Sequence, residues 1–308
     1  MNKKTGEVKW SYNIRKDGDQ NNFHGDPLIT DELVITSTDG GSRPTGIGSV
    51  YAFEKLTGKV RWRFDGGRGV PTGILRLGKR IYFVTFDDEL ISLDLETGRR
   101  IWSFGRRNAN NQYFITITPV GKAEVVFFGA LSGKAYAVHS ETGKALWERD
   151  LGSRISSLVL SNDSLYAGTA GKRIYHLNGK TGEVMKEFVA SGELYWQLVL
   201  SRDSLITHIE EKTLVCLPKS LDTPQWTQHS TTPWSSSRPY VWQGLAVVGT
   251  EDGRVDALQL ADGKLQWTQK FTGPIGGIGG ERDVLYIGTR RGRLYAFQIK
   301  SSERRKSK

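Results

Sequence analysis

Short runs in which apolar and polar residues alternate recur along the whole chain at intervals of about 40 residues. Alternate side chains of a strand point to opposite faces of a sheet, so these runs predict half-buried β-strands. The clearest runs are residues 49–53, 89–93, 134–138, 173–177, 254–258 and 293–297. Other runs precede them, such as residues 164–169 and 245–250, and runs such as 155–160 and 195–200 open their units. No segment of about ten residues has a helical period.

A six-residue motif, Thr-Gly-x-x-x-Trp, follows most of these runs and fixes the repeat. Clear copies end at Trp10, Trp62, Trp102 and Trp147, and a variant with Asp in place of Thr ends at Trp267. Degenerate copies occupy residues 181–186 and 221–226, the second ending at Trp226. The Gly supplies the positive φ that a tight hairpin turn needs. We therefore expect the motif between the third and fourth strands of each unit, with the six Trp rings packed between neighbouring blades.

Four short strands per unit are typical of a propeller blade. The sequence predicts an all-β fold, a seven-bladed β-propeller of four-stranded antiparallel blades. Residues 293–300 have no fourth strand after them, and residues 7–14 look like a fourth strand with no blade before it. We expect these segments to pair and close the ring, which removes exposed sheet edges. The predicted blades span residues 24–66, 70–106, 113–151, 155–190, 194–230, 236–272, and 275–299 with 5–14.

One domain is expected over residues 1–300, followed by a basic, disordered tail over residues 301–308. Net charge is +10, but the last nine residues carry five basic side chains and one acidic one. The excess is therefore largely a tail effect, and no nucleic-acid partner is expected. The single Cys216 excludes an intrachain disulfide and paired-cysteine zinc sites. No apolar run is long enough to cross a bilayer as a helix. We expect a monomer with no transmembrane segment.

The first motif begins at residue 5, and no apolar segment precedes it, so the sequence predicts no signal peptide in this chain. Two compartments stay open. The chain is periplasmic or extracytoplasmic if a leader has been removed, and cytoplasmic otherwise.

The element Tyr-Ala-x-x-x-x-Thr-Gly-x-x-x-Trp, clearest from Tyr51 to Trp62 and from Tyr136 to Trp147, resembles the repeat of pyrroloquinoline-quinone-like (PQQ-like) propellers. The resemblance covers essentially the whole chain. It implies the propeller fold and either of two functions. One branch holds quinone-dependent dehydrogenases, which bind calcium beside the quinone. The other holds non-catalytic scaffolds, including the lipoprotein of the outer-membrane β-barrel assembly machinery. The chain departs from both branches, because the dehydrogenases and the lipoprotein typically have eight blades and this chain has seven units. It also lacks the dehydrogenases' large insertions and vicinal cysteine pair and the lipoprotein's N-terminal cysteine. The resemblance implies the architecture and a binding scaffold, not a particular partner.

Candidate contact residues come from the predicted inner strands and the loops that enter them. His24 lies in a loop that is longer than in the compact units, and loops often carry function. Asp26 and Arg238 fall in a column of otherwise small or polar residues that is expected to line the central channel. They could pair with each other or bind a polar ligand.

Aromatic and basic residues near the same predicted face form a second set. Trp196 and Trp234 lie outside the repeat motif, and with Tyr113 and Tyr195 they suggest either an aromatic rim that docks a partner or edge packing of irregular blades. Arg68, Arg106 and Arg154 lie in loops that enter inner strands and favour an anionic partner.

No nucleophile, base and orienting residue occur together in a recognisable motif, and no pair of His has metal-binding spacing. The sequence predicts a non-enzymatic scaffold that binds a protein or peptide through its loop-rich channel face, with no cofactor and no metal. The alternative is a PQQ- or metal-dependent oxidoreductase, or another propeller enzyme, with its site in the channel.

Overall fold

The structure is a computed structural model of the whole chain. It describes residues 5–18, 23–38, 47–67, 69–70, 73–105, 117–194, 197–235 and 238–298. The chain divides into two compact units, which are treated separately below. Unit 1 comprises Met1–Leu160 and Gly179–Glu183, and unit 2 comprises Ser161–Asn178 and Val184–Lys308. Among the described residues the only helical element is a short 3-10 helix, η1 (Ile14–Asp17). No helix in this part of the chain is long and apolar enough to span a membrane.

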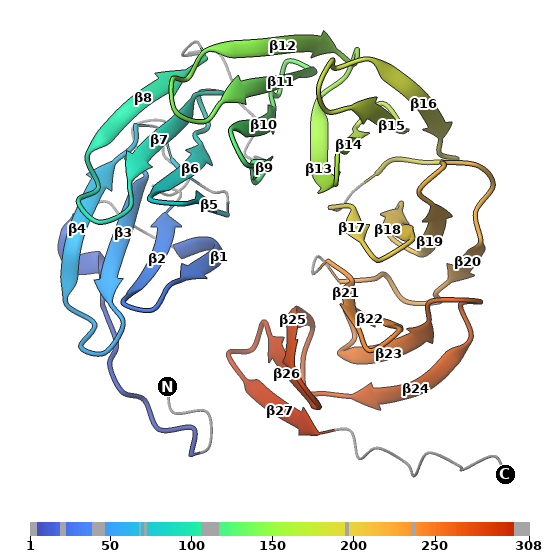
Figure 1. Cartoon of the computed structure of the whole chain (residues 1–308). Helices are drawn as coiled ribbons and strands as arrows, with labels where there is room; N and C mark the ends of the chain where they lie inside the picture. The colour runs from blue at the N-terminus through green and yellow to red at the C-terminus, as the bar shows by residue number, and fades with distance from the viewer. Residues whose placement is uncertain are drawn as a thin grey trace, which may run out of the picture. The chain divides into compact units, whose positions relative to one another are not determined.

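Unit 1 holds three four-stranded antiparallel sheets, which we number as blades 1 to 3, and the first strand of blade 4. In chain order the strands are β1 (Phe23–Ile29), β2 (Leu33–Thr38), β3 (Ser49–Glu54), β4 (Val60–Asp65), β5 (Leu75–Leu77), β6 (Arg80–Val84), β7 (Leu90–Asp94), β8 (Arg100–Phe104), β9 (Val120–Lys122), β10 (Val125–Gly129), β11 (Lys134–His139), β12 (Ala145–Asp150) and β13 (Ile155–Ser161). Each blade is a meander in which consecutive strands pair. Within this unit, β4, β8 and β12 run along one side and β1, β5 and β9 along the opposite side (Figure 1).

Unit 2 holds the remaining strands of blade 4 and blades 5 to 7. These strands are β14 (Ser164–Thr169), β15 (Arg173–Asn178), β16 (Val184–Val189), β17 (Val199–Leu200), β18 (Ser204–Ile209), β19 (Thr213–Pro218), β20 (Trp226–His229), β21 (Tyr240–Trp242), β22 (Leu245–Gly249), β23 (Arg254–Gln259), β24 (Leu265–Lys270), β25 (Ile275–Glu281), β26 (Val284–Thr289) and β27 (Leu294–Gln298). Blades 4 to 6 have four strands, and blade 7 has three, β25 to β27. The predicted all-β, seven-bladed β-propeller fold is confirmed.

The second and third strands of each blade carry the core because neighbouring sheets cover both of their faces. All six residues of β18 are buried, whereas β12 is exposed at five of its six positions. Between blades 1 and 2, one apolar cluster joins Ile35 and Val50 to Phe83 and Ile91. The strands therefore read as continuous apolar runs at the centre of a blade and as mixed sequence at its outer strand.

The Thr-Gly-x-x-x-Trp motif makes one recurring contact with the following blade at five of its positions. The Trp on the fourth strand lays its ring against the motif Gly of the following blade and donates its indole N–H to the carbonyl three residues before that Gly. The bonds run from Trp10 to Lys55, Trp62 to Leu95, Trp102 to Ser140, Trp147 to Gly179 and Trp226 to Leu260, at 2.8–3.0 Å. A Cβ added to Gly98 would lie 2.6 Å from Cδ2 of Trp62, so only glycine fits beneath the ring. These five contacts agree with an interblade packing role for the motif Trp residues.

The N-terminal segment contacts blade 1 in the way that a fourth strand contacts the next blade, without being a strand itself. Trp10 lies on Gly58 as the other Trp residues lie on their glycines. Tyr12 and Tyr51 both donate their hydroxyls to Asp17, at 2.7 and 3.0 Å. Residues 5–13 have no strand assignment, because a strand needs a hydrogen-bonded neighbour and none of the ladders in the described residues includes them. The expected strand at residues 7–14 is therefore not observed, and its pairing with the C-terminal blade stays a prediction.

Candidate functional site

The predicted contact residues that the structure describes lie apart from one another along the chain. Asp26 is exposed on β1, and Arg154 is half-buried immediately before β13, both in unit 1. In unit 2, Arg238 is exposed just before β21. His24 is part of β1, and nothing is described of its side chain. The remaining candidates lie outside the described residues; they are Arg68, Arg106, Tyr113, Tyr195 and Trp196.

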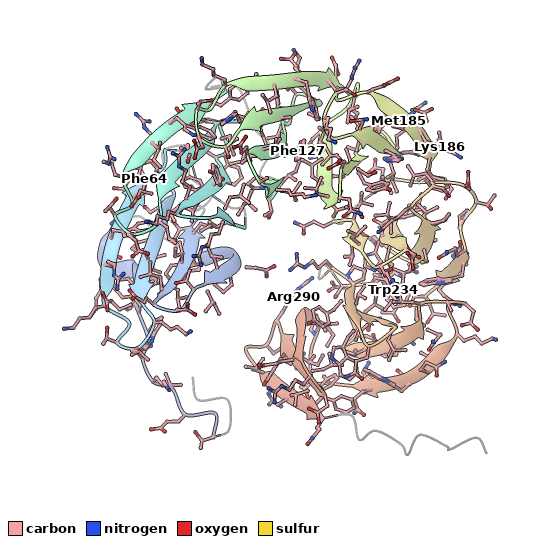
Figure 2. All side chains as sticks on the ribbon, viewed as in Figure 1. Phe64, Phe127, Met185, Lys186, Trp234 and Arg290 are labelled. Carbon is pink, nitrogen blue, oxygen red and sulfur yellow. The ribbon has the colours of Figure 1, made fainter. Side chains whose placement is uncertain are left out.

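Trp234 is packed inside unit 2 rather than presented at a rim. Its side chain is 5% exposed and belongs to the apolar cluster between blades 5 and 6 (Figure 2). Its ring stacks on His208 of β18, with centroids 6.0 Å apart and an interplanar angle of 28°. The burial favours the edge-packing interpretation that the sequence left open for this residue.

The pKa of His208, which lies beside this cluster, is strongly shifted. The residue is fully buried, and within the described residues neither ring nitrogen has a hydrogen-bond partner. Burial without a partner disfavours the charged imidazolium, and it lowers the pKa of His208 to about 3. His208 is therefore neutral at physiological pH and serves as a core residue. It occupies the position held by Gly168 in blade 4 and Gly249 in blade 6.

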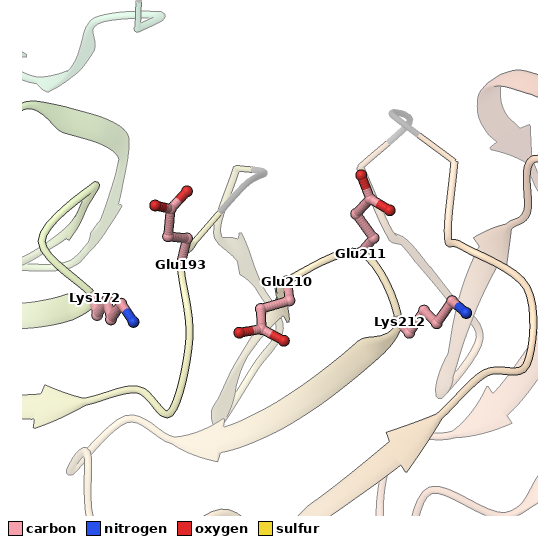
Figure 3. A pocket seen from close by; sticks show the side chains of 5 residues that line it. All are labelled: Lys172, Glu193, Glu210, Glu211 and Lys212. Carbon is pink, nitrogen blue, oxygen red and sulfur yellow. The ribbon is translucent and has the colours of Figure 1, made fainter.

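A charged cleft of about 440 Å³ opens on unit 2 (Figure 3). It is lined by Lys172, Glu193, Glu210, Glu211 and Lys212. Lys172 comes from the turn between β14 and β15, and Glu193 from the connection that precedes β17. The other three residues form the turn between β18 and β19. Blades 4 and 5 thus each supply a hairpin turn to the cleft. The segment that joins the two blades lines the cleft between these turns.

Backbone hydrogen bonds hold this cleft in shape. The amide of Glu210 donates to the carbonyl of Glu193 at 2.8 Å, which ties the turn of blade 5 to the connecting segment. The amide of Trp234 donates to the carbonyl of Glu211 at 2.7 Å, so the buried tryptophan anchors the far side of the turn. A Cβ on Gly192 would lie 2.3 Å from Oε1 of Glu210, so a larger residue there would displace this carboxylate. The cleft is built by the fold rather than by loose side chains.

The charged groups of the cleft differ from those at the same turn of the next blade. In blade 6, Glu251 accepts two hydrogen bonds from Arg290, at 2.8 and 3.1 Å. Its neighbour Asp252 pairs with Lys270 at 2.7 Å, and this partner and the Thr250 hydroxyl lower the pKa of Asp252 to about 2. Within the described residues, the side chains of Glu210 and Glu211 make no ion pair. The carboxylates of blade 5 are therefore available to a partner, whereas those of blade 6 are satisfied internally.

Reasoning from the sequence did not single out these five residues. The signal lay in the turns between the second and third strands, where Glu210-Glu211-Lys212 stands at the position of the Gly-containing turns Glu251-Asp252-Gly253 and Arg290-Arg291-Gly292. A turn without glycine, with Glu210 at a φ of 56°, was a local sign of a constrained and charged surface. Within the described residues, the cleft included, no three His, Cys, Asp or Glu side chains gather as a metal site would require.

These features define a PQQ-like repeat β-propeller whose motif tryptophans serve interblade packing. A family model described as outer membrane protein assembly factor BamB matches residues 1–188 and 189–308. The chain belongs to this family.

Individual relatives agree with that assignment. Outer membrane protein assembly factor BamB of Yersinia pestis is 28% identical over 189 residues, which is 56% of this chain and 48% of that protein. The chain spans about half the length of the curated relatives it matches first. Quinohemoprotein alcohol dehydrogenase ADH IIB of Pseudomonas putida is 29% identical over 138 residues, which is 39% of this chain and 19% of that protein. The crystal structure of BamB from Moraxella catarrhalis has a TM-score of 0.78 at 19% identity, and the match covers 95% of this chain and 88% of the other.

Proposed function

We propose that this protein is a non-enzymatic scaffold that binds protein partners during outer-membrane protein assembly. The observation that carries the proposal is the family match, which runs through both halves of the chain. The fold is consistent with a scaffold, because the motif Trp rings pack against glycines of the neighbouring blades and are not free to stack on a cofactor.

We propose further that the cleft of unit 2 receives the partner. Its lining combines three carboxylates with two ammonium groups. A partner segment with charges of both signs would place a Lys or Arg against Glu210 and Glu211 and an acidic side chain against Lys172 and Lys212. Charge complementarity of this kind selects the partner and speeds association. His24, Asp26, Arg154 and Arg238 remain candidates for a second contact.

A charge-reversal experiment tests both parts of the proposal. The chain, joined to the leader of Salmonella typhimurium BamB, is produced in a Salmonella strain that lacks BamB, and the amount of folded outer-membrane β-barrel proteins is measured. We expect the wild-type chain to raise that amount and the double variant Glu210→Lys/Glu211→Lys to lose the effect. Glu183→Lys, an exposed reversal in the turn before β16, is the matched control and should behave as wild type.

The outcomes separate the function from the site. A wild-type chain that fails to raise the folded β-barrel proteins, although it is folded and exported, would contradict the proposed function. A Glu210→Lys/Glu211→Lys variant as active as the wild type would leave the function standing and contradict the cleft as the partner site.

The alternative is a quinone-dependent oxidoreductase, which the match to the Pseudomonas alcohol dehydrogenase favours. Calcium beside a quinone needs several oxygen ligands together. The described residues hold no such group of carboxylates, so this part of the chain does not fit the cofactor. Adding pyrroloquinoline quinone and calcium to the purified protein and measuring alcohol oxidation tests the alternative. Turnover that depends on both additions would replace the scaffold proposal.

A further inference from the structure

The junction of blades 4 and 5 in unit 2 lacks the Trp–Gly contact that recurs at five other motif positions. On the fourth strand of blade 4, Lys186 pairs in register with His176, as Trp62 pairs with Ala52 and Trp226 with Cys216. Lys186 therefore occupies the motif Trp position. In the facing turn of blade 5, Asp222 stands at the position of the motif Gly. Both members of the Trp–Gly pair have been replaced together.

The replacement pair makes its own bond. The ammonium of Lys186 contacts a carboxylate oxygen of Asp222 as a hydrogen-bonded ion pair. The hydroxyl of Ser220 donates to the other oxygen of the same carboxylate at 2.6 Å, which fixes its orientation. The pKa of Asp222 is lowered, first by the hydrogen bond from Lys186 and then by the one from Ser220. An ionic contact thus joins blades 4 and 5 where an aromatic one joins the other pairs.

The carbonyl that a Trp indole would use keeps only its tyrosine partner. By position this acceptor is Lys219, three residues before Asp222, and its carbonyl accepts the hydroxyl of Tyr166 at 3.0 Å. In blades 2 and 3, the carbonyl of Ser140 accepts both the indole of Trp102 and the hydroxyl of Tyr82. The junction of blades 4 and 5 therefore keeps the tyrosine bond and loses the tryptophan bond.

The two kinds of contact respond differently to the solvent. The side chains of Lys186 and Asp222 are 44% and 57% exposed, so salt screens their attraction. A Trp ring that rests on a glycine backbone is held by apolar burial and a hydrogen bond, which salt weakens little. The outer strand β16 also carries the exposed apolar side chains of Val184, Met185 and Val189. Because these side chains face solvent, as Met185 does in Figure 2, they do not hold β16 to blade 5.

We propose that Lys186 and Asp222 form an electrostatic latch between blades 4 and 5. Raising the ionic strength or removing one charge frees β16 from blade 5, while the blades joined by tryptophan stay in contact. The latch makes this junction the part of unit 2 that opens first.

Hydrogen–deuterium exchange of the full chain, measured by mass spectrometry, tests the latch. Peptides that cover β16 report the latch, and peptides that cover β20 report the Trp226 contact in the same unit. Between about 20 mM and about 500 mM sodium chloride, we expect exchange in β16 to become about two- to fivefold faster, the range that loss of one exposed ion pair allows. Exchange in β20 should change less than β16.

Charge variants separate the pair from a general effect of salt. Lys186→Ala should exchange rapidly in β16 at both salt concentrations, and Lys186→Asp should exchange faster still. The swapped variant Lys186→Asp/Asp222→Lys should restore slow exchange and its salt response. Lys134→Ala removes an exposed ion pair with Glu148 within blade 3 and is the matched control. Exchange in β16 that is unchanged in Lys186→Ala, or a swapped variant that stays as fast as Lys186→Asp, would overturn the latch.

Discussion

Replacing His208 by leucine should remove much of the acid sensitivity of the fold. The native imidazole is fully buried without a hydrogen-bond partner in the described residues, and its pKa lies near 3. In the unfolded chain an exposed imidazole has a pKa of about 6.5. Between these two values the unfolded chain binds a proton that the folded chain does not. The free energy of unfolding therefore falls as the pH falls from about 6.5 towards 3.

The size of the effect follows from the two pKa values. One proton taken up only by the unfolded chain changes stability by about 1.4 kcal/mol per pH unit well below pH 6.5. From pH 7 to pH 5 this amounts to about 2 kcal/mol, because the first half unit lies above the midpoint. At pH 7 the leucine variant should be at least as stable as wild type, since it replaces two unsatisfied buried nitrogens with apolar atoms.

Urea unfolding followed by tryptophan fluorescence at pH 7 and pH 5 measures the effect. We expect the wild-type protein to lose about 2 kcal/mol more between these pH values than His208→Leu. The other histidines are common to both proteins and cancel in the comparison. Equal losses in the two proteins would refute the buried, neutral His208.

Other features of the fold make their own predictions. Gly98→Ala places a Cβ against Trp62 at a φ of 67° and should lower the free energy of unfolding by more than ~2 kcal/mol, whereas Gly78→Ala, with a φ of 60° and open space, should lower it by about 1 kcal/mol; equal effects in thermal or urea melts would contradict the ring contact. Trp62→Phe loses the indole bond to Leu95 and should lower stability by about 1–3 kcal/mol, measured in the same melts. Deleting residues 1–14 removes the Trp10 contact and the predicted closing strand, so the melting temperature should fall by about 5 °C or more. Deleting residues 301–308 is the control, and equal melting temperatures would speak against a structural role for the N-terminal segment.

The repeated features of this fold were predictable because their causes are local. A Thr-Gly turn, the run before it and the Trp after it recur at fixed offsets, so each copy strengthens the interpretation of the others. The glycine turns have the expected positive φ, from 67° to 72° at Gly98, Gly58, Gly143, Gly182 and Gly263. The expected strand over residues 254–258 is observed as β23 (Arg254–Gln259).

The features that depend on a single meeting of distant side chains were not predictable. The sequence around Trp234 is compatible both with an exposed rim and with stacking on His208. Only the folded structure distinguishes the two. Lys186 and Asp222 looked like separate degenerate positions, and only the packing of blade 4 on blade 5 brings their side chains together. The cleft of unit 2 is likewise formed by two hairpin turns and the segment between them. These parts are separated along the sequence and belong to no single motif. Of the predicted strand over residues 195–200, residues 195 and 196 lie outside the described residues, and within 197–200 the strand β17 covers Val199–Leu200.

In-cell photo-crosslinking from the cleft tests the central proposal most directly. A photoreactive amino acid replaces Glu211, and a matched protein carries it in place of Lys264, an exposed residue in the turn before β24. We predict that irradiation crosslinks the Glu211 variant, and not the Lys264 variant, to a protein of the outer-membrane assembly machinery. Crosslinks from both positions alike, or from neither, would contradict a partner site in the cleft.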